Sequence, residues 1–198
     1  MAEETKAHCT MDELIDIITF SSGGFTMMPS RDMDEVYPRV YVGDQRSAKS
    51  IAKLKRLGIT HILNTALGHD RQHVDSNVQT YKDIGAEFKG IEATDQNSFK
   101  LKEFFEETTE FIDKALDSGG KVLVHCCEGA SRSATIAIAY LMLHQHMTAQ
   151  DAVRLVRKHR EICPNDGFLQ QLCDLNEELH AKGHFKSETE TAADKSDD

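Results

Sequence analysis

The chain has 198 residues, of which 39% are hydrophobic and 28% charged, so it is long enough to bury the core of one domain. Its formal net charge of −10 argues against a nucleic-acid or membrane surface, because both attract clustered lysine and arginine. No apolar run approaches the length of a membrane span, and the N-terminus lacks the basic and apolar segments of a signal peptide. We therefore expect a cytoplasmic protein, with the nucleus open to it by diffusion.

Hydrophobic periodicity and turn residues predict strands that alternate with helices. Thr10 and Glu13 form a capping box that opens a short N-terminal helix. Strands are predicted at 39–43, 60–65, 87–93 and 121–126, and further helices at 47–58, 101–120, 133–145, 148–160 and 168–182. This alternation predicts an α/β fold, with a mostly parallel central sheet flanked by helices.

The predicted domain runs over residues 10–183, after a flexible N-terminus at 1–9. Residues 184–198 are acidic, small and polar, which predicts a disordered tail. The five cysteines include no CxxC pair, which excludes a zinc ribbon or a thioredoxin-like motif. The thiols are expected to stay reduced and free for chemistry.

The most informative stretch is VLVHCCEGASRS, residues 122–133. It predicts a short apolar strand, a loop from Cys126 to Arg132, and then a buried helix. Such a loop points backbone N–H groups at one spot, and the helix dipole adds partial positive charge there. Gly129 lets the loop curl, and the planar fork of Arg132 suits two phosphate oxygens. This setting favours the thiolate of Cys126 and places it for in-line attack on phosphorus.

This stretch resembles the phosphate-binding loop of cysteine-dependent protein phosphatases. Four further segments resemble the small, VHR-like branch of the dual-specificity phosphatases: PRVYVGD (38–44), LGITHILNTALG (57–68), AYLM (139–142) and HREICPNDGFLQQLCDLN (159–176). The resemblance runs from about residue 9 to 183. It implies hydrolysis of phosphotyrosine and phosphoserine or phosphothreonine in phosphoproteins, through a phosphocysteine intermediate and without metal or cofactor. At the level of the family, the expected substrates are MAP kinases.

The resemblance also implies the role of each catalytic residue. Cys126 is the nucleophile, and Arg132 binds the phosphate and stabilises the transition state. Ser133 matches the hydroxyl that hydrogen-bonds the thiolate and helps to break the intermediate, and His125 matches the residue that tunes the thiol from behind. Asp95 lies where the family has its general acid, which protonates the leaving oxygen.

The other loop residues are predicted to line the phosphate site: Cys127, Glu128, Gly129, Ala130 and Ser131. Arg160 matches a residue that helps to bind a second phosphate beside the pocket, or it closes a helix as a solvated end residue. The chain departs from its relative at Cys127, where the relative has a basic residue, and at Ala130, where it has an aromatic one. The smaller Ala130 leaves the preference for phosphotyrosine open. Glu128 and the absence of a loop lysine disfavour phosphoinositides.

Several of these residues have a plainer interpretation. Cys127 is expected to be a packing or surface thiol, with trapping of an oxidised Cys126 as the other interpretation. Asp166 is a second carboxylate that could rival Asp95, but its surroundings in PNDG predict a helix cap. His69 and His73 have no evident third ligand, so we expect surface polar residues and no metal site.

Three other functions share parts of this pattern. A phosphoprotein-binding module with weak catalysis is the alternative, although such a module is expected to lack at least one of Cys126, Arg132 and Asp95. A rhodanese-type sulfur transferase would need neither His125 nor an upstream acid. An RNA 5′-triphosphatase would need a basic surface, which the net charge opposes.

Overall fold

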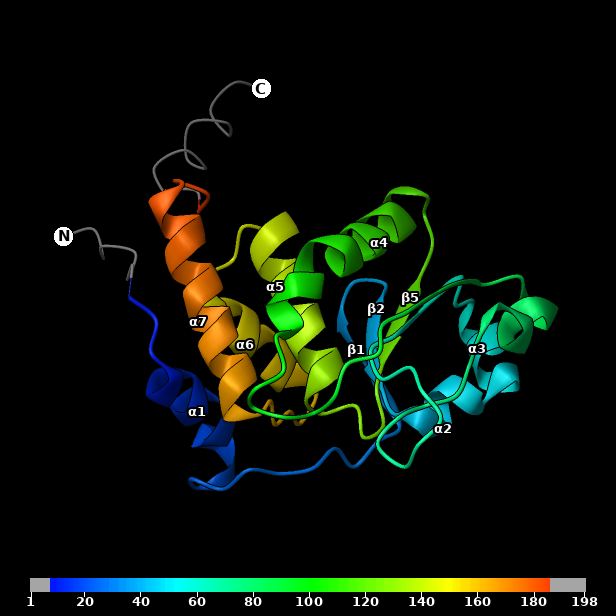
Figure 1. Cartoon of the computed structure of the whole chain (residues 1–198), viewed down its shortest axis with the longest axis horizontal. Helices are drawn as coiled ribbons and strands as arrows, with labels where there is room; N and C mark the ends of the chain where they lie inside the picture. The colour runs from blue at the N-terminus through cyan, green and yellow to red at the C-terminus, as the bar shows by residue number, and fades with distance from the viewer. Residues whose placement is uncertain (1–7, 186–198) are drawn as a thin grey trace, which may run out of the picture.

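A five-stranded sheet forms the centre of the computed structural model, which describes residues 8–185 (Figure 1). The strand order is β1-β2-β5-β3-β4. The strands are β1 (Met33–Tyr37), β2 (Val40–Gly43), β3 (His61–Asn64), β4 (Glu87–Gly90) and β5 (Val122–His125). Only β1 is antiparallel to its neighbour. The predicted α/β fold with a mostly parallel sheet is therefore confirmed.

Helices cover both faces of the sheet, as parallel strands require (Figure 1). One side carries α1 (Met11–Thr19), α4 (Phe105–Asp117), α5 (Arg132–His144), α6 (Ala149–His159) and α7 (Asp166–Ala181). The other side carries α2 (Gln45–Lys49) and α3 (Ile51–Leu57). Three 3₁₀ segments complete the elements: η1 (Phe20–Ser22), η2 (Val78–Ile84) and η3 (Leu101–Phe104).

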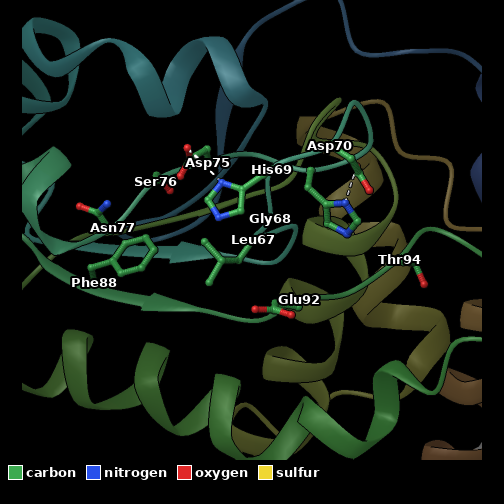
Figure 2. A pocket seen from close by; sticks show the side chains of 11 residues that line it. Leu67, Gly68, His69, Asp70, Asp75, Ser76, Asn77, Phe88, Glu92 and Thr94 are labelled. Atoms are coloured by element: carbon green, nitrogen blue, oxygen red, sulfur yellow. Dashed lines mark hydrogen bonds and ion pairs between the residues drawn. The ribbon is translucent and has the colours of Figure 1, made fainter.

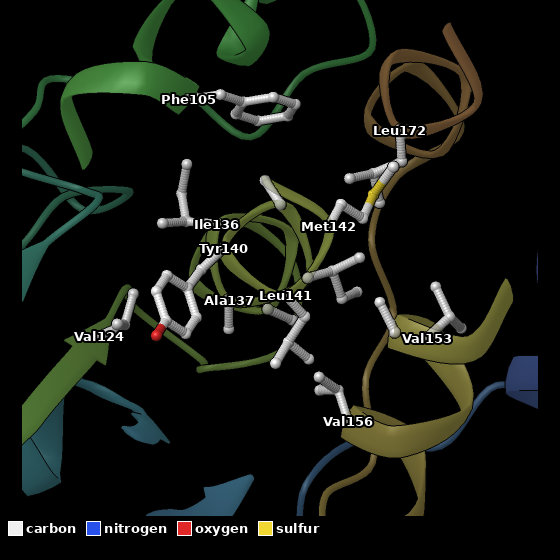
Figure 3. Close-up of a cluster of buried hydrophobic side chains, with 14 of the residues drawn as sticks. Phe105, Val124, Ile136, Ala137, Tyr140, Leu141, Met142, Val153, Val156 and Leu172 are labelled. Carbon is white, nitrogen blue, oxygen red and sulfur yellow. The ribbon is translucent and has the colours of Figure 1, made fainter. Parts of the chain in front are cut away.

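Helix α5 lies at the middle of the larger core (Figure 3). Its side chains are apolar nearly all round, and they meet Val124 of β5, Phe105 of α4, Val156 of α6 and Leu172 of α7. A helix with no polar face must be buried on every side. The position of its first residue, Arg132, is therefore fixed by the packing of four other elements.

Some predicted elements differ from the observed ones. The predicted helix at 47–58 is two helices that meet at Ser50, and the first begins earlier because the Asp44 carboxylate accepts hydrogen bonds from the N–H groups of Arg46 and Ser47. The predicted helix at 101–120 opens with η3 and ends at Asp117. Strand β1 and segment η2 were not predicted. β1 is a short edge strand whose register shifts midway, so its sequence shows little alternation.

Residues just outside the predicted domain boundaries pack against the domain. Cys9 is buried, and its Sγ lies 2.8 Å from the Sγ of Cys173 in α7. His184 Nε2 lies 3.1 Å from the Met142 carbonyl oxygen. Most of the predicted flexible N-terminus and acidic tail, residues 1–7 and 186–198, lies outside the described residues. Within residues 8–185, no helix has the length and apolar character to span a membrane.

Candidate active site

The predicted phosphate loop, residues 126–132, connects the central strand β5 to the buried helix α5. His125 ends β5 and pairs in parallel register with Gly43 of β2 and Asn64 of β3. The loop therefore leaves the sheet at the carboxyl ends of three parallel strands, which is where α/β proteins commonly bind ligands.

The Cys126 sulfur is surrounded by hydrogen-bond donors. The Gly129 N–H donates to Sγ at 3.2 Å, and the Ser133 hydroxyl lies 3.3 Å from it. The residue is only 1% exposed. Donors at these positions stabilise a thiolate, because they favour the charged form of the group that they contact.

Gly129 is needed for this loop conformation. Its φ is +66°, in the left-handed region that favours glycine. A Cβ atom at this position would lie 2.5 Å from the carbonyl carbon and oxygen of Gly43 and 2.6 Å from Nη2 of Arg160. Both backbone conformation and space therefore require glycine, as the sequence pattern predicted.

The N-terminus of α5 keeps its N–H groups available. Ser131 occupies the N-cap position, but its side chain makes no capping hydrogen bond to the helix. Its hydroxyl donates instead to Oδ1 of Asp95 at 2.7 Å. The first amides of a buried 13-residue helix are thus left for an anion, and the helix dipole favours negative charge at the same place.

The Arg132 guanidinium is anchored by hydrogen bonds on one side, and on the other it makes a long ion pair without a hydrogen bond. Nη1 donates to the backbone oxygens of Gln72 and Ala93, both at 2.9 Å. Nε is buried and makes no hydrogen bond, and it lies 3.5 Å from Oδ2 of Asp95. A buried donor without an acceptor is costly, so a phosphate oxygen that reached Nε would relieve that cost. Sequence reasoning missed Gln72 and Ala93, because backbone acceptors leave no signal in residue type.

Asp95 lies beside the phosphate loop, although it follows a different strand. Its Oδ1 accepts hydrogen bonds from Ser131 Oγ at 2.7 Å and from Asn165 Nδ2 at 2.8 Å. Its side chain is about one third exposed (32%). The structure therefore brings the predicted acid together with the loop of the predicted nucleophile. Asn165 was predicted only as part of a helix cap, and it does cap α7 by accepting the Phe168 N–H.

His125 is buried behind the nucleophile as a neutral ring. Burial lowers its pKa from 6.5 to about 4, because a charged imidazolium would lose its hydration. Neither ring nitrogen makes a hydrogen bond of normal geometry. At neutral pH, His125 therefore contributes shape and polarity behind Cys126, and no positive charge.

Arg160 does not lie where the prediction of a second phosphate contact needs it. Its side chain is fully buried and pairs with Asp34, with Nη1 at 2.7 Å from Oδ2. Nε donates to the Gly129 carbonyl at 2.7 Å, and Nη1 also donates to the Arg31 carbonyl at 3.1 Å. The other interpretation, a solvated helix end, does not fit this burial either. Arg160 supports the phosphate loop from inside the protein.

The remaining loop residues have mainly structural contacts. The Cys127 thiol donates to the Gln72 carbonyl at 2.9 Å, and burial raises its pKa, which opposes the thiolate. Ala130 is 3% exposed, and its carbonyl accepts the N–H of Cys163 at 2.8 Å. Glu128 is exposed. Cys127 thus fits the packing interpretation.

A cavity of about 610 Å³ lies beside the site, between the loop after β3 and the ends of β4 and its following loop (Figure 2). Two histidine–aspartate pairs line it: His69 with Asp75 at 3.2 Å, and His73 with Asp70 at 2.5 Å. Thr94, next to the predicted acid, also lines it. Each histidine thus has one carboxylate partner, and within residues 8–185 no three His, Cys, Asp or Glu side chains gather as a metal site would need.

Comparison with known proteins agrees with this geometry. Residues 40–178 match the family described as dual specificity phosphatase, catalytic domain. The chain is 45% identical over 147 residues to dual specificity protein phosphatase 26 of Pongo abelii, covering 74% of this chain and 68% of that protein. The crystal structure of human DUSP28 matches with a TM-score of 0.66 and 27% identity, over 79% of this chain and 99% of that one. The human tyrosine phosphatase-like serine/threonine/tyrosine-interacting protein matches with a TM-score of 0.65 and 34% identity, over 76% and 99%.

Proposed function

Since the chain belongs to the dual-specificity phosphatase family and is a protein phosphatase, we propose that Cys126, Arg132 and Asp95 carry its reaction. The observation that supports this most directly is the position of the Cys126 sulfur. It lies 3.2 Å from the Gly129 N–H, in the loop that leads to the uncapped N-terminus of α5. The same loop ends in Arg132, whose Nε is buried without a hydrogen bond.

The proposed reaction has two steps. The Cys126 thiolate attacks phosphorus and forms a sulfur–phosphorus bond, while the bond from phosphorus to the leaving oxygen breaks. Asp95 gives that oxygen its proton, and Arg132 with the α5 amides stabilises the charge on the phosphoryl oxygens. Water then attacks phosphorus, Asp95 takes the proton back, and the sulfur leaves as a thiolate next to Ser133.

The test is hydrolysis of a small aryl phosphate across pH with a chelator present, for wild type, Cys126→Ser and Asp95→Asn. We expect turnover by the wild type, none by Cys126→Ser, and phosphate binding by both. Asp95→Asn should lower the rate by about 100-fold and remove the alkaline limb of the profile. A wild type that binds phosphopeptide without turnover would instead support the binding-module alternative.

We also propose that the phosphoprotein substrates include MAP kinases. The support is the family resemblance alone, because Arg160 is buried and so provides no second phosphate contact. Cys126→Ala protein should retain a doubly phosphorylated MAP kinase more tightly than a phosphopeptide of the same activation segment. Equal retention of kinase and peptide would argue against the kinase as a specific partner. The cytoplasmic and nuclear location stays a prediction.

A further inference from the structure

The segment that carries the predicted acid rests on the first two turns of α7. We call residues 94–100 the acid loop. Gln171 of α7 donates to the Phe99 carbonyl at the end of this loop at 2.9 Å, and it accepts the N–H of Lys102, in the η3 segment that follows, at 2.8 Å. Asn165, the N-cap of α7, donates to Asp95 itself at 2.8 Å. A helix that takes no part in binding phosphate thus contacts the acid loop at both ends.

Gly167 brings the middle of the acid loop against the same helix. A Cβ atom on Gly167 would lie 2.0 Å from the carbonyl oxygen of Asn97 and 2.6 Å from its carbonyl carbon and Cα. These are backbone atoms, so a side chain at this position would have to displace the loop. Gly167 is required here because the two backbones approach so closely.

We propose that the start of α7 holds the acid loop in its working position before substrate binds, and that Asn165 is the positioning residue that orients the Asp95 carboxyl group. This proposal rests on the role proposed above for Asp95 as the general acid. Its basis is the agreement of three independent contacts, made by Asn165, Gly167 and Gln171, on one short loop.

The hydrogen bonds also distinguish the two carboxyl oxygens of Asp95. Oδ1 accepts from both Ser131 and Asn165. An oxygen that accepts two hydrogen bonds is a poor place for a proton, so the proton belongs on Oδ2. Oδ2 is the oxygen 3.5 Å from Nε of Arg132, on the side where the phosphate is expected. Asn165 therefore turns the proton-bearing oxygen toward the leaving group.

Asn165 allows this role to be separated from helix capping. Its Oδ1 accepts the Phe168 N–H at 3.0 Å, and its Nδ2 donates to Asp95. Asn165→Asp keeps a capping acceptor and replaces the donor with a second carboxylate oxygen that repels Asp95. Gly167→Ala provides an independent variant, which displaces the loop without touching the carboxyl group.

The test compares two substrates that differ only in the leaving group. Phenyl phosphate needs its leaving oxygen protonated, whereas p-nitrophenyl phosphate releases a weakly basic oxygen that needs little help. For Asn165→Asp and Gly167→Ala, we expect kcat on phenyl phosphate to fall by about 10-fold or more and kcat on p-nitrophenyl phosphate by less than about 3-fold. Gln170→Ala, on the exposed face of the same turn, is the control and should leave both rates unchanged.

Equal losses on the two substrates, or no loss on either, would overturn the proposal, because a merely structural role cannot select by leaving group. Adding Asn165→Asp to Asp95→Asn should cause no further selective loss, since the group being positioned is gone. If Asp95→Asn itself lowers both rates equally, the assignment of the acid is wrong. That outcome is distinct from a failure of Asn165 or Gly167 alone.

Discussion

The phosphate loop and the acid loop meet at one site but are held in opposite ways. In the phosphate loop, every residue except Glu128 is buried, and a buried ion pair supports it from inside. In the acid loop, every residue is at least partly exposed. Two side-chain hydrogen bonds, from Asn165 and Gln171, and one close backbone approach at Gly167 hold it against the start of α7. Substitutions that affect the phosphate loop should therefore lower the free energy of unfolding, whereas those that affect the acid loop should lower only the activity.

The largest expected effect is the loss of stability in Arg160→Met. This change leaves the Asp34 carboxylate, 9% exposed, without its main partner, and the Gly129 carbonyl without its donor. Breaking a buried pair costs about 3–5 kcal/mol, a large part of the stability of a domain. Urea unfolding should show this loss. Arg154→Ala, which breaks an exposed pair on α6, the helix that Arg160 caps, should cost less than about 1 kcal/mol.

A double variant tests the physical cause of that loss. Arg160→Met with Asp34→Leu removes both charges, so much of the lost unfolding free energy should return. The double variant could instead be less stable than Arg160→Met, as expected for a second, independent core substitution. The loss in Arg160→Met would then not come from an unpaired carboxylate. The phosphate loop would then depend on packing alone.

Arg160 also shows which kind of contact could not be predicted from the sequence. The strand, Cys126, Gly129 and Arg132 could be placed from residue type and spacing, because the loop depends on local backbone geometry. The partner of Arg160 is Asp34, in a strand that the sequence did not predict. A basic residue near a phosphate site is expected to contact phosphate unless a buried acidic partner is known. Asp34 is that partner, and only the fold brings it into contact with Arg160.

The acid loop could be predicted only in part, for the same reason. Asp95 was predicted from the resemblance to the phosphatase family, which has its general acid on a loop after a strand upstream of the nucleophile. Asn165 was recognised by its local role as a cap, which it has. Its second contact joins residues 70 positions apart, and no periodicity or spacing encodes such a contact. The same holds for Gly167, which was predicted only as part of the helix cap in PNDG.

The second largest expected effect is the dependence of stability on pH through His125. Its pKa is about 4 in the folded protein and 6.5 as an ordinary side chain, so between these values the unfolded chain binds a proton that the folded chain does not. The unfolding free energy should therefore fall by about 3 kcal/mol as the pH drops from 7 to 4. His125→Leu should remove this component in urea titrations.

The exposed His159 supplies the control for that experiment. His159→Leu should keep the pH dependence of the wild type, since this side chain is exposed and lies outside the buried core. If the slope between pH 7 and 4 is the same in His125→Leu as in the wild type, carboxylates cause the acid sensitivity, and His125 does not set it.

The third effect concerns catalysis at Ser133, the residue that follows the phosphate loop in α5. Ser133→Ala removes the hydroxyl 3.3 Å from the Cys126 sulfur, and a hydrogen bond to a charged group contributes about 1.5–3 kcal/mol. The rate of phosphocysteine hydrolysis should fall by about 10- to 100-fold, because the departing thiolate loses a donor. Burst kinetics on an aryl phosphate would show accumulation of the intermediate. A loss of rate without a burst would mean that the Ser133 hydroxyl acts in the first step, the formation of the phosphocysteine.

The smallest expected effect is at Ser131, which links the two loops through its 2.7 Å hydrogen bond to Asp95. Ser131→Ala removes one of the two donors to Oδ1 of Asp95, so that only the hydrogen bond from Asn165 still holds this oxygen. The kcat on phenyl phosphate should fall by about 3- to 10-fold, because one of the two hydrogen bonds that hold the proton donor is lost. Stability should change by less than about 1 kcal/mol.

Ser98→Ala, exposed in the acid loop, is the control. If Ser131→Ala lowers the free energy of unfolding as strongly as a change at Arg160, the Ser131 hydroxyl stabilises the buried phosphate loop. The contrast between the two loops would then not hold at the residue that joins them.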